Sequence, residues 1–449
     1  MRASFALISI LLLSALALAD VYYPAEIKVE NVGELETQVN ATWTIVLDGD
    51  VSTLEEVHLV VFGFSNYSSQ YVKSFSASPQ PALNISGNGE DYSLDFTWKN
   101  PQSNTLEATA QFVLVTNFQN NSLTRPQPFP FDSQVGFLKD SPLVFINDEM
   151  NAQTQAFSQD TSDAFQIAAG VSEWVHNNMV YDLQYAEVNL TAPEAFAIRR
   201  GVCDEYSHLA AAFMRHLGIP AKVSVGYVFS GESWGLHSWI EIYSPENNVW
   251  ISTDPTFNEM GVLDATHLRM VSVEDQSYAS EESSMVGSDH VGMKLLRNVS
   301  ISVIRSQDLA KHATLSVIGS EFNITAETIY ANVSNPFDEY IFAPVTIREP
   351  LNSTLFGESD RLVYLKPHET RQLEWVVSFP GLEKGFVYTY SITVSTLGEE
   401  KEIHFSKSPG PKEDQIPIGG TTTTRTKSPC QVSVAILALI PAILFVRRN

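Results

Sequence analysis

Between residues 199 and 256 the chain reads Arg199-Arg200-Gly201-Val202-Cys203-Asp204-Glu205-Tyr206, then His237-Ser238-Trp239-Ile240-Glu241-Ile242-Tyr243, then Trp250-Ile251-Ser252-Thr253-Asp254-Pro255-Thr256. A thiol, an imidazole and a carboxylate follow one another in that order. Nucleophilic acyl chemistry needs these groups as nucleophile, base and orienting group. Cys203, His237 and Asp254 are therefore the candidate catalytic residues.

The thiol is expected at the start of a helix. One apolar stripe recurs every four residues, at Leu209, Phe213 and Leu217, which predicts a helix that begins at Cys203. The helix dipole and the free N–H groups at this end favour a thiolate and an oxyanion. Because Asp204 and Glu205 oppose the thiolate locally, we expect His237 to supply most of the activation.

The imidazole and the carboxylate are expected on neighbouring strands. Residues 237–243 alternate with the period of a strand, residues 249–254 form a second strand, and 244–248 are turn-like. Folding this hairpin brings Asp254 beside His237, within about one residue of register. The carboxylate would then set the tautomer and orientation of the imidazole.

These motifs resemble the core of the transglutaminase-like superfamily, over about residues 165–264. The resemblance rests on Gly-Val-Cys-Asp-Glu-Tyr, Leu-Gly-Ile-Pro-Ala-Lys, His-Ser-Trp-Ile-Glu-Ile-Tyr and Trp-Ile-Ser-Thr-Asp-Pro-Thr. It implies an α+β, cysteine-protease-like fold, with Cys203 as nucleophile, His237 as base and Asp254 as its orienting group. Members of the superfamily include cross-linking transferases, cysteine peptidases, amidases and inactive relatives, so the reaction stays open.

The length and charge of the chain limit its organisation and its partners. A chain of 449 residues predicts two or three domains. The net charge of −25 argues against nucleic acid and against docking on an anionic membrane face. No cofactor is indicated. Asp264 and His267 lie three residues apart, but their spacing matches no metal motif; we expect no metal and a solvated loop covering the site.

The flanking regions read as β domains. Residues 1–19 are expected to be a signal peptide, with a first transmembrane helix as the weaker alternative. Short alternating segments predict an antiparallel β-sandwich over 20–130. The core is expected over 136–290, with helices at 161–178 and 192–200. An immunoglobulin-like sandwich is expected over 295–405, the alternative being a β continuation of the core.

The C-terminal end reads as a stalk and an anchor. Residues 406–429 are rich in Pro, Gly and Thr, and 430–449 form a short apolar segment that ends in two arginines. This tail resembles the sorting tails of archaeal surface proteins. In the most similar of these tails, the cysteine is followed by Gly-Pro. Cys430 is followed by Gln431 and Val432 instead. Cys430 is a candidate for anchor processing.

Two further sets of residues bear on the compartment and the site. Sequons for N-glycosylation indicate an exported glycoprotein; they stand at Asn40, Asn66, Asn84, Asn120, Asn189, Asn298, Asn323, Asn332 and Asn352. Cys203 and Cys430 are the two cysteines of the sequence, and both are expected to be unpaired. Tyr181 and Trp174 precede the nucleophile and are either oxyanion donors or core residues.

The sequence therefore predicts a surface-anchored thiol enzyme that hydrolyses amide bonds of extracellular protein or glycoprotein. Transfer of the acyl group to an amine, which would cross-link proteins, is the first alternative. A non-catalytic adhesion or binding module is the second.

Overall fold

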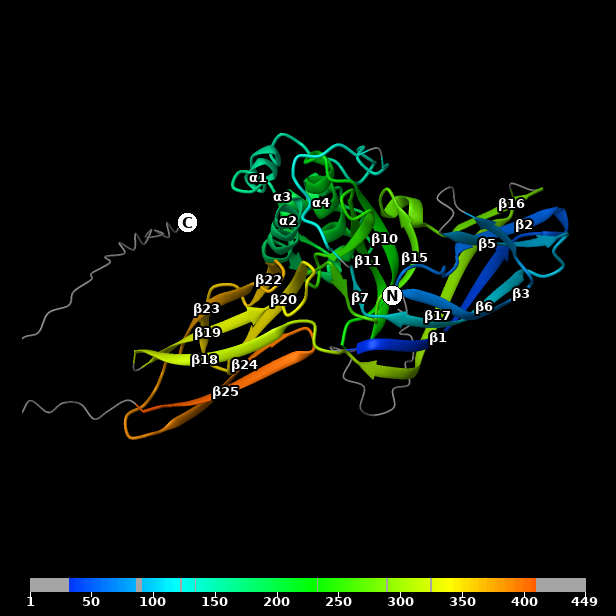
Figure 1. Ribbon diagram of the computed structural model, residues 1–449. Helices are drawn as coiled ribbons and strands as arrows, with labels where there is room; N and C mark the ends of the chain where they lie inside the picture. Colours follow the sequence, from blue (N-terminus) through cyan, green and yellow to red (C-terminus); the bar gives the residue numbers. More distant parts are fainter. Residues whose placement is uncertain are drawn as a thin grey trace, which may run out of the picture. The chain divides into compact units, whose positions relative to one another are not determined.

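The computed structural model describes residues 32–408, except residues 86–90, 122, 134, 232, 288–289 and 324 (Figure 1). The predicted signal peptide, nearly all of the predicted stalk, the predicted anchor and Cys430 lie outside this part. All described residues belong to one compact unit of the chain. Within them, no helix has both the length and the apolar character needed to cross a membrane.

Two four-stranded antiparallel sheets form the N-terminal β-sandwich. The first has the order β17 (Gly292–Asp308), β1 (Val32–Asp48), β6 (Thr105–Asn117), β3 (Gln70–Ser78). The second has the order β16 (Glu282–Val286), β2 (Glu56–Phe62), β5 (Tyr92–Lys99), β4 (Ala82–Ile85). Strand β2 buries every second residue, and these side chains join a hydrophobic cluster shared by both sheets. This is the period expected of a half-buried strand.

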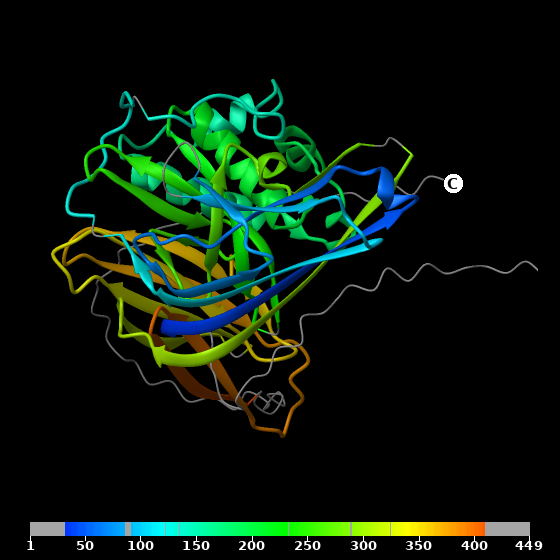
Figure 2. The same cartoon turned by 90° about the vertical axis from the view of Figure 1, so that its right-hand side faces the viewer.

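Two strands of this sandwich follow the core in the sequence, which corrects part of the predicted domain division. β17 pairs with β1 from Val32↔Asp308 to Asp48↔Gly292, and the two long strands lie side by side in Figure 2. β16 pairs with β2. Residues 282–308 therefore complete the N-terminal sandwich, whereas the sequence assigned them to the core (136–290) and to the C-terminal domain (295–405). Alternation identifies a strand, but it does not identify a partner at the far end of the chain.

The core consists of helices packed on a five-stranded antiparallel sheet, and the predicted α+β class is confirmed. The sheet has the order β13 (Glu259–Met260), β12 (Val249–Asp254), β11 (Trp234–Ser244), β10 (Ala221–Phe229), β15 (Leu268–Val273). The α-helices are α1 (Asn151–Ala156), α2 (Ala164–Asn178), α3 (Ala192–Ile198) and α4 (Cys203–His216). Short 3-10 helices lie at Val51–Thr53, Leu183–Tyr185 and Gln276–Ala279.

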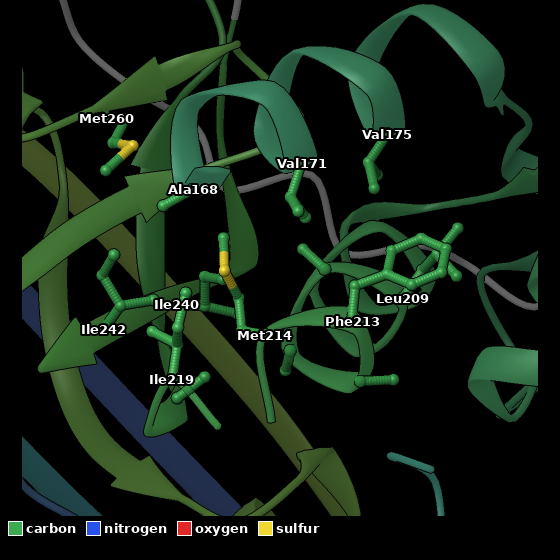
Figure 3. Packing of buried hydrophobic residues seen from close by; sticks show 14 of the residues in the cluster. Ala168, Val171, Val175, Leu209, Phe213, Met214, Ile219, Ile240, Ile242 and Met260 are labelled. Atoms are coloured by element: carbon green, nitrogen blue, oxygen red, sulfur yellow. The ribbon is translucent and has the colours of Figure 1, made fainter. Parts of the chain in front are cut away.

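Helix α4 is the centre of the core. Two residues of its apolar stripe, Leu209 and Phe213, have no exposed surface, and the third, Leu217, is half-buried at the C-terminal cap. Figure 3 shows Val171 and Val175 of α2 near these two residues, and Met214 near Ile240 of the sheet. Burying a side chain of this size contributes about 1.5–3 kcal/mol. The position of the first turn of α4, and therefore of Cys203, is determined by this packing.

The C-terminal β-sandwich has its own hydrophobic cluster and two four-stranded sheets. One sheet has the order β18 (Thr314–Asn323), β19 (Ala326–Ser334), β23 (Thr370–Ser378), β21 (Thr354–Phe356). The other has the order β22 (Asp360–Leu365), β20 (Ile341–Arg348), β24 (Tyr388–Thr396), β25 (Glu399–Lys407). Phe342 and Tyr364 place their rings 6.1 Å from that of Phe165 in α2, and the Tyr364 hydroxyl donates a 3.0 Å hydrogen bond to Asp163.

A buried ion network joins the N-terminal sandwich to the core sheet. Arg269 of β15 is 2% exposed; its Nη2 lies 2.8 Å from Asp91 Oδ1 and its Nη1 lies 3.2 Å from Glu241 Oε1. Although burial opposes ionisation, Lys222 and Arg269 lower the pKa of Glu241 to about 2. Gln70 of β3 exchanges two hydrogen bonds with the Arg269 backbone. Arg269 therefore connects Gln70 and Asp91 on the N-terminal side to Glu241 of β11, the strand that carries His237.

We predict that Arg269→Met lowers the free energy of unfolding by about 3–5 kcal/mol, because Asp91 would stay buried without its guanidinium partner. Urea unfolding followed by circular dichroism measures this change. Arg305→Met is the control, since the exposed Arg305–Glu34 pair should contribute less than about 1 kcal/mol. Equal losses in both variants would contradict a special role for the buried network.

Candidate active site

Cys203 is the first residue of α4 and is 6% exposed. The chain enters the helix from β9 (Arg200–Gly201), which pairs in parallel with β8 (Val180–Tyr181), and Val202 is extended. Gly201 is required by a close approach: a Cβ atom there would lie 2.5 Å from the Cβ of Glu205. Gly201 therefore leaves room for the side chain of Glu205 at the entry to α4.

Glu205 fixes the loop that carries the nucleophile. Its carboxylate has no exposed surface and accepts hydrogen bonds from the backbone N–H groups of Val202, at 2.8 Å, and Leu190, at 3.2 Å. Burial raises the pKa of Glu205 to about 7, although these two N–H groups lower it. Val202, the residue before Cys203, is thus held by the side chain of Glu205 in the first turn of α4.

The thiol of Cys203 lies in surroundings that favour its neutral form. Burial and the Asp204 carboxylate raise the pKa of this thiol well above its ordinary value, and the backbone N–H of Ser238 opposes them. Sγ donates a weak hydrogen bond to Asp204 Oδ1 at 3.7 Å. A thiol with a raised pKa is a poor nucleophile by itself, so an adjacent base is needed. The sequence led to the same expectation, because Asp204 opposes a thiolate at Cys203.

His237 and Asp254 are held together by a short buried hydrogen bond. His237 Nε2 lies 2.6 Å from Asp254 Oδ2, and the two side chains are 3% and 0% exposed. Burial would raise the pKa of Asp254, but His237 and His267 hold it well below its ordinary value. Asp254 therefore occupies Nε2 of the imidazole. The ring of Phe257 stacks on the imidazole at 5.2 Å.

The register of the hairpin differs slightly from the predicted one. The paired residues of β11 and β12 run from Ser244↔Val249 to Ile240↔Thr253, and this register sets Asp254 level with residue 239 rather than 237. Residues two apart on a strand share one face, so the carboxylate still reaches His237. The contact depends on this shared face and not on direct pairing.

A hydrogen bond between side chains joins the strand of the base to the helix of the nucleophile. Ser238 Oγ donates to Asp204 Oδ1 at 2.7 Å, and it lies 3.3 Å from Ser207 Oγ. Ser238 follows His237 and Asp204 follows Cys203, so each partner is next to a predicted catalytic residue. The structure thus joins the strand that carries His237 to the helix that Cys203 begins; α4 packs on β10 and β11 (Figure 1).

The two aromatic residues left open by the sequence have different roles. The Tyr181 side chain interacts with the Cys203 thiol, and burial and the thiol raise the pKa of Tyr181. A phenol that stays protonated is a hydrogen-bond donor. Trp174, in contrast, packs in the core, 5.9 Å from Phe196 and 5.5 Å from Phe213. The parallel pairing of Tyr181 with Gly201, two residues before the nucleophile, could not be read from the sequence.

A second histidine on Asp254 was not predicted. His267 Nε2 lies 3.2 Å from Asp254 Oδ2, and His267 is 3% exposed. The expectation of a solvated loop over residues 264–290 is wrong at this position, because the chain after Asp254 forms β13 and β14 (Val262–Leu263) and enters β15. The sequence signal that could have indicated a buried His267 is its spacing from Asp264, which the sequence analysis tests against metal motifs alone.

The remaining predicted site residues lie at or near the surface. Among the sequon asparagines whose side chains are described, Asn66, Asn84, Asn120, Asn189, Asn298 and Asn352 are exposed, and Asn40 and Asn332 are half-buried. The side chain of Asn323 and Cys430 lie outside the described part. Cys203 is unpaired. Two groups of described residues have the ligand types and spacing for a metal ion: His237 with Asp254 and His267, and Glu259 with Asp264 and His267.

Comparison with known proteins agrees with this geometry. A family model of the transglutaminase-like superfamily matches residues 151–255, which include Cys203, His237 and Asp254. Residues 151–255 are a transglutaminase-like core. The superfamily suggested by the sequence is thereby supported for this part, which is less than half of the chain.

Two curated proteins are similar to part of this chain. An uncharacterised protein of Bacillus subtilis, YebA, is 28% identical over 123 residues, which are 22% of this chain and 16% of that protein. A protein-glutamine gamma-glutamyltransferase of Pseudomonas aeruginosa is 30% identical over 104 residues, which are 20% of this chain and 15% of that protein. The matches span about a sixth of the length of these relatives.

Solved structures show more distant similarity. A protein from Cytophaga hutchinsonii, described as a candidate cysteine protease, aligns with a TM-score of 0.45 and 16% identity, covering 62% of this chain and 94% of that one. The transglutaminase of red sea bream aligns with a TM-score of 0.20 and 10% identity, covering 62% of this chain and 72% of that one.

The raised pKa of Glu205 predicts that stability falls as the pH rises. Folding favours the protonated carboxyl, so its contribution is complete below the unfolded value of 4.5 and is lost as the pH passes about 7. The loss is at most about 3 kcal/mol. The free energy of unfolding, measured in urea between pH 4 and pH 8, should depend less on pH in Glu205→Gln.

Glu194→Gln is the matched control. Like Glu205, Glu194 accepts a hydrogen bond from the backbone N–H of the residue that precedes its helix, here Thr191 before α3, but the pKa of Glu194 is lowered. The contribution of Glu194 to the free energy of unfolding therefore has the opposite pH dependence, and it is lost as the pH falls. A Glu205→Gln variant with the pH dependence of the parent would show that Glu205 does not titrate in this range.

Proposed function

We propose that this chain is a thiol enzyme that acts on amide bonds of extracellular proteins, by hydrolysis in the first place. The observation that carries the proposal is the buried 2.6 Å bond between His237 and Asp254, on a strand tied to the first turn of the helix that Cys203 begins. The transglutaminase-like core supports the thiol-enzyme class and leaves the reaction open.

In the proposed reaction, His237 Nδ1 takes the proton of the Cys203 thiol while Sγ attacks the amide carbonyl. Asp254 keeps the proton on Nε2 and stabilises the imidazolium, as the third group of a triad does. The Tyr181 hydroxyl and the backbone N–H of Ser238 are the donors proposed to stabilise the oxyanion. His237 then gives its proton to the leaving nitrogen, the C–N bond breaks, and a thioester remains on Cys203.

Water or an amine resolves this thioester. Water gives an acid and restores the thiol, whereas a primary amine gives a new amide. The Pseudomonas aeruginosa relative is named for transfer to an amine, which favours acyl transfer as the second candidate. We prefer hydrolysis because water needs no second binding site. A non-catalytic binding module remains the third reading, and it predicts no thioester.

Cys203→Ala should abolish activity, and Asp254→Asn should lower kcat by about a hundredfold or more, because the imidazole loses its orienting carboxylate. The test is incubation with a denatured protein substrate, scored for released ammonia, new amino termini and incorporation of a fluorescent primary amine. These three signals separate deamidation, proteolysis and transfer. Tyr181→Phe should retain the fold and lose about tenfold or more in kcat.

Cys430→Ala is the control for loss of a cysteine and should be fully active. Covalent labelling of Cys203 by iodoacetamide should slow in His237→Ala. Full turnover by Cys203→Ala would exclude the proposed nucleophile, and labelling that is independent of His237 would favour the binding module.

We also propose that the enzyme is exported and anchored by its C-terminal segment. The support is in the sequence: a signal-like segment at 1–19, sequons between the two apolar segments, and a short apolar tail that ends in Arg447 and Arg448. Truncation after Gly420 should yield a secreted, soluble and active protein, whereas the full chain should fractionate with membranes. Membrane association of the truncated protein would place the anchor elsewhere.

A further inference from the structure

Three side chains beside the triad bring metal-ligand atoms together. They are Glu259 in β13, Asp264 just after β14 and His267 just before β15, and one ligand atom from each lies within 4.8 Å of the others. The reaction proposed above uses none of them. The group is therefore a separate feature of the core, connected to the triad only through His267.

Two atoms of this group have no hydrogen-bond partner although they are buried. His267 is 3% exposed, and its Nδ1 is unpartnered; the Asp264 carboxylate oxygen, at 3.4 Å, is too far for a good hydrogen bond. The Oε2 atom of Glu259 is also buried without a partner. Buried polar atoms are normally satisfied, so an unpaired nitrogen and an unpaired oxygen within one group of possible metal ligands point to a bound ligand.

Two of the three side chains are also held in place by other hydrogen bonds. His267 directs Nε2 to Asp254 Oδ2 at 3.2 Å, and Asp264 Oδ1 accepts hydrogen bonds from the backbone N and the hydroxyl of Thr266, at 2.7 and 2.5 Å. A histidine that binds a metal nearly always donates its second N–H to a carboxylate or carbonyl. His267 has this arrangement, with its Nε2 on a carboxylate and its Nδ1 open.

An ion can reach these residues from solvent. Glu259 and Asp264 line a cavity of about 310 Å³ that is also lined by Phe257, Glu400 and Arg348. Three of the four charged residues of this cavity are acidic, and Arg348 already has a partner. The cavity leads to the carboxylate side of the group and leaves room for water on the remaining coordination positions.

We propose that Glu259, Asp264 and His267 bind one divalent transition-metal ion of the Zn²⁺ or Mn²⁺ class, with water completing the coordination. One imidazole nitrogen and two carboxylate oxygens suit these ions, whereas Ca²⁺ and Mg²⁺ prefer oxygen ligands alone. An ion on Nδ1 keeps the His267 proton on Nε2, where it is donated to Asp254. The ion thus acts as a positioning element behind the triad carboxylate and takes no part in bond making.

The test is direct binding of Zn²⁺ and Mn²⁺ to the full-length, chelator-treated protein in the Cys203→Ala, Cys430→Ala background, which removes both thiol ligands. Calorimetry and metal analysis should give about one ion per chain, and the thermal midpoint should rise with Zn²⁺. Glu259→Gln and Asp264→Asn should each weaken binding at least tenfold, the size typical of a lost ligand or its support. His267→Gln should do the same.

Two controls separate this site from other groups. His58 also lies beside two carboxylates, 3.0 Å from Glu56 and 3.6 Å from Asp95, yet it belongs to neither candidate metal group; His58→Ala should bind normally. His237→Ala should also bind normally, which distinguishes the proposed ligands from the His237–Asp254–His267 group.

Because binding is measured without turnover, this result is independent of the proposed function. Absence of saturable binding of either ion would overturn the proposal, and so would binding that survives both Glu259→Gln and Asp264→Asn. If His267→Gln alone fails to fold, the two carboxylate variants still decide the question. A loss of binding in His237→Ala that matches the loss in His267→Gln would move the ion onto the triad itself and contradict the site proposed here.

Discussion

The arrangement of the transglutaminase-like core depends on one buried carboxylate, Asp254. Its side chain has no exposed surface, and four donors share its two oxygens: the rings of His237 and His267 on Oδ2, and the backbone N–H groups of Thr256 and Phe257 on Oδ1. A buried anion without partners would cost several kcal/mol. Because the donors come from β11, from the turn after β12 and from the segment before β15, stabilising this charge also fixes the relative positions of these three segments.

The nucleophile is restrained by a second buried carboxylate, which acts differently. Glu205 is not paired with a cation; it holds the backbone on either side of the entry to α4, at Leu190 and Val202. Gly201 is needed because the Glu205 side chain occupies the space of a Cβ atom. The two carboxylates therefore act at different places: Asp254 binds the imidazole of His237, and Glu205 binds the backbone ahead of Cys203.

The β-sandwiches are packed parts of this unit and not loosely attached domains. Arg269 joins the core sheet to Asp91 on the N-terminal side, and Phe342 and Tyr364 pack against α2 on the C-terminal side. The curated relatives match this chain over about a sixth of their own length. The cavity that leads to Glu259 and Asp264 is lined partly by the C-terminal sandwich, so it is a property of this combination of domains.

The sequence by itself determined the local elements and the chemical types of the catalytic groups. Apolar spacing after Cys203 identified α4, alternation identified the strands of His237 and Asp254, and the turn between them made their contact expected, because these signals act over a few residues. The tertiary structure alone decided what joins residues far apart in the chain. The pairing of β17 with β1, the contact between Tyr181 and the thiol, and the burial of His267 against Asp254 depend on which surfaces meet. Strand and helix periodicity records which face of an element is buried, but it does not record the partner that covers it.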